Sequence, residues 1–83
     1  MTYTYRPKGT CSQQMTVELD GNIIKDVKIL GGCNGNLQGI SNLVKGMDAN
    51  EAIRRMKGVK CGFKNTSCPD QLAIALEEAM KQQ

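Results

Sequence analysis

The spacing of apolar residues changes once along the chain, in the segment 31–36. Before it, apolar side chains recur at every second residue, which is typical of strands with one buried face. These positions are Met15, Val17, Leu19, Ile23, Val27 and Ile29. After it, the period lengthens to about 3.6 residues, the repeat of an α-helix. The pattern therefore predicts strands first and helices second.

Three strands are predicted, over residues 2–5, 14–19 and 23–30. The first is favoured by its alternating Thr and Tyr residues. Residues 20–22 form a hairpin turn between the other two. A three-residue turn sets Leu19 opposite Ile23 and keeps one apolar face, so we expect it, with Asn22 in the left-handed conformation. Lys25 interrupts that face.

Three helices are predicted after the strands. The first ends at Gly46, the second begins at Asp48 with Glu51 as a capping-box partner, and the third opens at Pro69. Their inner faces comprise Leu37, Ile40, Leu43, Val44 and Met47, then Ala52, Ile53 and Met56, then Leu72, Ala73, Leu76, Ala79 and Met80. The expected fold class is α+β, with a three-stranded antiparallel sheet and about three helices packed on one face.

Composition limits the class of protein. Residues 1–83 are expected to form one domain, and a chain this short has a marginal core that a metal, a disulfide or oligomerisation commonly supports. The net charge of +3 is mild and permits an anionic partner. The sequence contains no stretch that reads as a signal peptide or membrane span, so we expect a cytoplasmic protein without a membrane partner.

Four cysteines carry the chemistry: Cys11, Cys33, Cys61 and Cys68. Cys11 follows the first predicted strand and Cys33 follows the third, so an antiparallel sheet places both at one end. Cys61 and Cys68 flank one loop, and Cys68 stands at a helix start. None of the four lies on an apolar stripe, which is where a core cysteine is expected.

Three interpretations of these cysteines stay open. They are buried hydrophobic residues without chemistry, or four thiolate ligands of a structural zinc, or a redox pair in which Cys68 attacks and Cys61 resolves. Cytosolic cysteines are rarely structural disulfides, and the chain has no histidine for a mixed zinc site. Lys64 would favour either a charged zinc–thiolate site or a reactive Cys68.

Two further segments are candidates for binding anions. The residues Gly31, Gly32, Asn34 and Gly35 lead into a helix and could hold a phosphate through backbone N–H groups. A strand-to-helix connection that needs glycine is the simpler explanation. Residues 54–64 carry five basic side chains and no acid, for which a solvated basic face is the simpler explanation.

The run Thr66-Ser67-Cys68-Pro69-Asp70, together with residues 31–37 and the four cysteines, resembles the short free-standing branch of the TSCPD domain family. That domain also occurs near the C-terminal end of adenosylcobalamin-dependent (class II) ribonucleotide reductases. The resemblance implies a link to ribonucleotide reduction, with a reductase or another protein of nucleotide metabolism as partner. A chain of 83 residues cannot hold the barrel, radical site and cobalamin site of such a reductase, so no cobalamin is expected on it.

Together these observations favour a small accessory or binding module tied by a four-cysteine zinc site. The alternatives are a thiol–disulfide relay to a reductase, with Cys68 and Cys61 as its pair, and a nucleotide-binding regulatory domain. A homo-oligomer is compatible with each of them.

Overall fold

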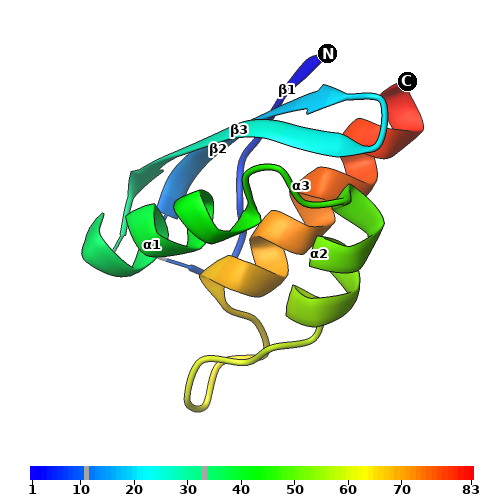
Figure 1. Ribbon diagram of the computed structural model, residues 1–83. Helices are drawn as coiled ribbons and strands as arrows, with labels where there is room; N and C mark the ends of the chain where they lie inside the picture. Colours follow the sequence, from blue (N-terminus) through cyan, green and yellow to red (C-terminus); the bar gives the residue numbers. More distant parts are fainter. Residues whose placement is uncertain (11, 33) are drawn as a thin grey trace.

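The computed structural model describes residues 1–10, 12–32 and 34–83, and it has two layers (Figure 1). One is a sheet of order β1-β2-β3, with both strand pairs antiparallel. The other consists of three helices on one face of that sheet. The bounds are β1 Thr2–Tyr5, β2 Ser12–Asp20, β3 Ile23–Gly31, α1 Asn34–Val44, α2 Ala49–Met56 and α3 Cys68–Gln82. The predicted α+β class is confirmed.

The hairpin between β2 and β3 turns over two residues. Asp20 pairs with Ile23, which leaves Gly21 and Asn22 in the turn. Gly21 has a φ of 61°, whereas Asn22 has a negative φ. A positive φ at the first position only is the pattern of a type II′ turn, whose twist matches that of the strands. The predicted three-residue turn with a left-handed Asn22 is therefore wrong.

A β-bulge in β3 keeps the sheet's apolar face continuous despite this shorter turn. Leu19 pairs with Ile24 and Glu18 pairs with Asp26, so Lys25 is the extra residue. Ile24 is consequently 0 % exposed, while Ile23, the predicted core residue, is 42 % exposed. The interruption at Lys25 in the sequence pattern marks this bulge.

The core forms where α3 packs against the sheet and α2. Most of the predicted inner face of α3 is fully buried: Leu72, Ala73, Leu76 and Ala79. Small alanines let the neighbouring backbones approach closely on both sides of the helix. From β2 the core takes Met15, Val17 and Leu19, as predicted. None of the helices in the described part of the chain is long and apolar enough to cross a membrane.

The helix α1 packs on β3 rather than on α2 or α3. Its Leu37 and Val44 are buried, as predicted, but Leu43 is 76 % exposed, so its assignment to the inner face is wrong. The helix starts earlier than the periodicity indicated, because residues 34–36 already form its first turn.

The adjacent isoleucines of β3 provide a test of the bulge. Ile24→Ala should lower the free energy of unfolding by about 2–5 kcal/mol, because it leaves a cavity in the core. Ile23→Ala is the matched control and should cost less than about 1 kcal/mol, because its side chain is partly in solvent. Urea denaturation of both variants measures the difference. Equal losses would contradict the bulged register.

Candidate functional site

Polar residues of the segment Thr66–Asp70 fasten the start of α3 to the loop before it. Ser67 is the N-cap residue of α3, and its Oγ accepts a hydrogen bond from the backbone N–H of Asp70 at 3.2 Å. The same hydroxyl donates to the carbonyl of Val59 at 2.6 Å. The Ser67 side chain therefore gives a free backbone N–H of the helix terminus a hydrogen-bond acceptor. It also holds the loop that carries Cys61.

The carboxylate of Asp70 is buried and accepts two hydrogen bonds. The hydroxyl of Thr66 donates one, and the backbone N–H of Gly58 donates the other at 2.7 Å. These bonds, the one from Thr66 first, lower the pKa of Asp70 below its usual value. Asp70 thus stays ionised and closes the loop 57–67 at both ends.

Gln71 extends this network to the N-terminal part of the chain. Its Oε1 accepts from the hydroxyl of Tyr5 and from the backbone N–H of Lys8, each at 3.0 Å. Its Nε2 donates to the Thr66 hydroxyl at 2.9 Å. Asp70 and Gln71 are buried polar residues whose structural role was not predicted from the sequence. Their position on the inward side of an amphipathic helix was the signal that could have identified them.

Two thiols lie beside this polar network. Cys68 is the first residue of α3, and its half-buried Sγ lies 2.9 Å from the Oγ of Ser12. Cys61 is exposed in the loop, where its backbone N–H bonds the carbonyl of Thr66 at 3.1 Å. Both are free thiols. The interpretation of the cysteines as buried hydrophobic residues without chemistry is therefore wrong for Cys61, which is exposed.

Cys61 and Cys68 line one small hollow of about 40 Å³, together with Thr10, Lys64, Thr66 and Ser67. The hydroxyl of Thr10 is buried there, and it has no hydrogen-bond partner within residues 1–10, 12–32 and 34–83. In folded proteins a buried hydroxyl normally has a hydrogen-bond partner. The volume suits one ion or one water molecule.

The other two predicted ligands, Cys11 and Cys33, lie outside the described residues. Their sequence neighbours are described: Ser12, after Cys11, pairs with Gly31 and contacts Cys68. The antiparallel topology on which their placement depended is confirmed, and their placement at one sheet end stays a prediction. In the part of the chain that is described, no group of three or more Cys, Asp or Glu residues could hold a metal.

The glycine-rich segment differs from the loop that was predicted. Gly31 is the last residue of β3, and Gly31 and Gly32 have φ values of 81° and 77°. These left-handed angles account for both glycines by backbone conformation alone. Asn34 and Gly35 belong to the first turn of α1. Phosphate binding by these four residues stays a prediction.

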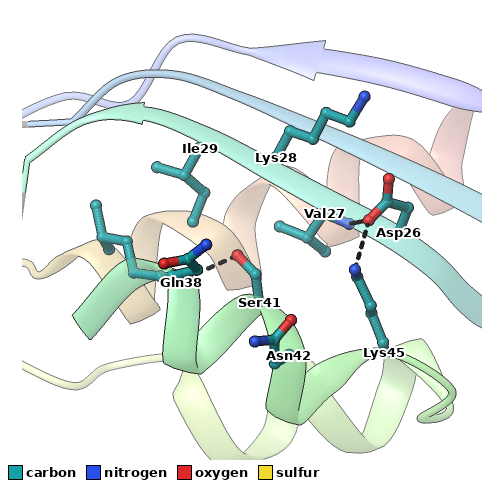
Figure 2. Close-up of a pocket in the computed structure, with 9 residues that line it drawn as sticks. Asp26, Val27, Lys28, Ile29, Gln38, Ser41, Asn42 and Lys45 are labelled. Carbon is teal, nitrogen blue, oxygen red and sulfur yellow. Dashed lines mark hydrogen bonds and ion pairs between the residues drawn. The ribbon is translucent and has the colours of Figure 1, made fainter. Parts of the chain in front are cut away.

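A second hollow, of about 330 Å³, lies between β3 and α1 (Figure 2). Its floor includes Val27 and Ile29, and Gln38 and Asn42 stand on its α1 side. The ammonium of Lys45 closes one end by pairing with Asp26 at 3.2 Å. No sequence pattern indicates this hollow, and it shares no lining residue with the thiol hollow.

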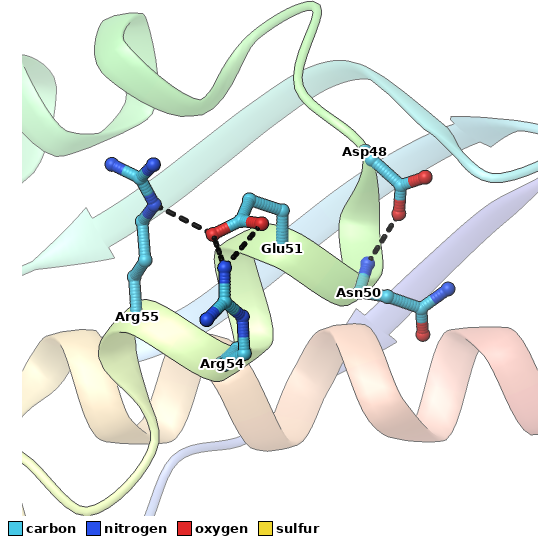
Figure 3. A network of polar contacts seen from close by, with 5 residues as sticks. All are labelled: Asp48, Asn50, Glu51, Arg54 and Arg55. Carbon is cyan, nitrogen blue, oxygen red and sulfur yellow. Dashed lines mark hydrogen bonds and ion pairs between the residues drawn. The ribbon is translucent and has the colours of Figure 1, made fainter.

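Three of the five basic side chains in residues 54–64 are paired with acidic residues of the chain. Arg54 and Arg55 both bind Glu51 on α2 (Figure 3), and Lys57 binds Glu77 on α3 at 2.7 Å. The hydrogen bonds from Arg54 and then Arg55 lower the pKa of Glu51 to about 2. These pairs support the solvated basic face over a phosphate-binding patch.

Figure 3 also shows how α2 begins. Asp48 is the N-cap residue, as predicted, and its carboxylate accepts from the N–H of Asn50 at 2.8 Å. Glu51 binds the two arginines. Of the predicted capping box, the structure therefore shows the cap by Asp48 but not the return bond from Glu51.

A family model described as the TSCPD domain matches residues 1–80 of the chain. No curated protein and no solved structure matches it.

The buried carboxylate predicts a defined response to substitution and pH. Asp70→Asn should lower the free energy of unfolding by about 1–3 kcal/mol at pH 7, because one of the two donors then faces an amide nitrogen. Glu77→Gln, which breaks an exposed pair, is the control and should cost less than about 1 kcal/mol.

The pKa of Asp70 is lower in the folded chain than its ordinary value of 3.8. The ionised Asp70 therefore contributes fully to the free energy of unfolding above about pH 4. This contribution is lost as the pH falls through the pKa of Asp70 in the folded chain. In urea titrations, the difference in free energy of unfolding between wild type and Asp70→Asn should therefore become smaller as the pH falls over that range. Glu51 and Asp26 also have lowered pKa values, but they are common to both proteins. A gap that stays constant down to about pH 2 argues against a buried, ionised Asp70.

Proposed function

We propose that this chain, which belongs to the TSCPD domain family, is a small binding module whose cysteines hold a structural zinc ion. The observation that carries the proposal is the thiol hollow. Two free thiols from different segments and one buried hydroxyl without a described partner line the same 40 Å³. Zinc binds thiolate sulfur well, and structural zinc sites have four ligands, in some of them four cysteines.

The chemistry of the residues present fits this ion. Cys61 and Cys68 would supply two thiolates, and Cys11 and Cys33 are the proposed sources of the others. Four thiolates around a divalent ion leave a charge of about −2, and Lys64 lines the hollow to offset it. The hydroxyl of Thr10 would then donate to a thiolate sulfur, as second-layer groups of metal sites do.

The ion would supply binding energy rather than catalysis. It would tie the loop 57–67 to the start of α3 and to the chain around Ser12, because a structural site links metal binding to folding. The loop so fixed presents Phe63, which is fully exposed at a turn closed by the bond from Lys64 N–H to the Cys61 carbonyl at 3.0 Å. An exposed aromatic side chain on a fixed loop suits a protein contact.

The partner we propose is a ribonucleotide reductase or another protein of nucleotide metabolism. The support is the resemblance of the TSCPD domain to the C-terminal region of class II reductases. Lys60 and Lys64 flank the exposed Phe63 in sequence, so a partner surface with apolar and acidic residues would complement this loop.

A thiol–disulfide relay is the second candidate function, and the shared hollow of Cys61 and Cys68 also favours it. The Cys68 thiolate would attack a disulfide of the reductase and release one reductase thiolate. Cys61 would then attack the mixed disulfide. The products would be a Cys61–Cys68 disulfide and a reductase dithiol, a transfer of two electrons.

Metal content tests the first candidate. Protein expressed in zinc-sufficient cells and purified without chelator should carry one zinc per chain in native mass spectrometry. Cys68→Ala should abolish this zinc and lower the thermal midpoint, because it removes a ligand. Ser12→Ala is the matched control, since it removes the oxygen beside the Cys68 sulfur but no thiol. It should keep one zinc, bound more weakly.

A chelator should release the ion from the wild type and loosen the loop 57–67, seen as faster amide exchange there. Metal-free protein whose melting and exchange equal those of the purified protein would refute the zinc site.

Alkylation at pH 7 tests the relay. Exposure alone makes Cys61 the faster thiol, because Cys68 is half-buried. A nucleophile activated at a helix N-terminus reverses that order. The relay therefore predicts that Cys68 of metal-free protein is alkylated first, and that mild oxidant forms the Cys61–Cys68 disulfide, both seen by peptide mapping. Slower alkylation of Cys68 than of Cys61 rules the relay out.

A further inference from the structure

The helices α1 and α2 leave an apolar groove between them, which shares no lining residue with the hollow of Figure 2. Its volume is about 450 Å³. Ile40, Leu43 and Met47 line one side, and Met56 of α2 and Pro69 at the start of α3 line the other. The groove exists because α1 packs on β3 whereas α2 packs on α3 (Figure 1). Flexible methionine side chains at such a surface adapt to what covers it.

The leucine at the rim of this groove is largely exposed to solvent. Leu43 is 76 % exposed, although its neighbour Val44 is buried and helps to anchor the helix on the sheet. Val59, also in the groove lining, is 44 % exposed. The surface therefore carries both a projecting apolar side chain and an apolar hollow beside it.

The outward face of α1 is unusual for a solvent-exposed helix. None of its residues from 34 to 44 is charged. Gly35, Gly39 and Leu43 recur every four residues and so form one row on the exposed side of α1. A Cβ added at either glycine meets no heavy atom of the described chain within 4 Å. Packing within the described chain thus gives no reason for the helix-weakening Gly39 in the interior of α1.

We infer that this face and groove bind a second copy of the chain. In an isologous pair the same patch serves both sides, so a projecting Leu43 beside a hollow is self-complementary. A two-fold axis near Leu43 places the Leu43 of each copy over the groove of the other copy. It also brings the two α1 helices together near Gly39, where glycine has no side chain to prevent a close approach.

The charge pattern is compatible with a second copy and disfavours a charged partner. The chain carries +3 overall, but the contact region on α1 is neutral, so two copies meet there without bringing like charges together. The ionisable residue in the groove lining is Arg55, whose Nε already binds Glu51 at 2.8 Å. Interface cores are likewise poor in charged residues.

The size of the patch predicts a weak dimer. An 11-residue helix is only about 16 Å long, so the contact falls at or below the low end of stable interfaces, about 1,200 Å² in total. We expect a dissociation constant of roughly 10–100 µM.

Sedimentation equilibrium tests the inference directly. Between about 1 µM and about 1 mM the weight-average mass should rise from 9.1 kDa toward twice that value. Leu43→Glu should raise the dissociation constant at least about 10-fold. Leu30→Glu is the matched control: Leu30 is an exposed leucine of β3 outside the groove, and its replacement should leave the constant unchanged.

A second variant separates association from folding. Gly39→Gln should raise the thermal midpoint of dilute protein by a few degrees, because glutamine is the better helix former, yet it should weaken the dimer by blocking close approach. A wild-type mass of 9.1 kDa at about 1 mM overturns the inference. So does a dimer that survives both Leu43→Glu and Gly39→Gln, because it would use another surface.

Discussion

The buried carboxylate of Asp70 is the group around which three distant segments are arranged. It requires hydrogen-bond donors, and they come from the loop at Gly58 and from Thr66. Thr66 in turn accepts from Gln71, whose carbonyl oxygen holds Tyr5 and the backbone of Lys8. Because each buried polar group needs all of its partners, the network fixes the start of α3, the loop and the end of β1 together.

That network positions the thiols. Cys68 follows the N-cap Ser67 and precedes Pro69, so its side chain leaves α3 at a fixed point next to Ser12. Cys61 is held from the other side by its bond to the Thr66 carbonyl. The sequence motif around Cys68 therefore has a physical explanation that is independent of any reaction. Its polar members build the frame, and its cysteine faces the hollow within that frame.

The sequence predicted the parts of the structure that local patterns encode. Alternation and helical periodicity placed the strands and helices, because burial on one side leaves that pattern in any chain. The bulge at Lys25 was visible only as an interruption, since register depends on how two strands pair. The roles of Asp70 and Gln71 could not be read locally, because Gln71 bonds Tyr5, which is 66 positions away. Leu43 was misassigned because periodicity alone cannot tell a buried apolar side chain from an exposed one at the edge of the same helical face.

The two proposals describe different ways of supporting a small core. A zinc ion would act within one chain, so its effect on the free energy of unfolding depends on metal and not on protein concentration. A dimer across α1 would act between chains and would stabilise the fold more as protein concentration rises. The thiol hollow and the α1 groove share no lining residue, so each effect can be removed by substitution without touching the other. The core of the described chain is built on one three-stranded sheet, and a core in a chain of 83 residues is marginal, so either support would raise the free energy of unfolding.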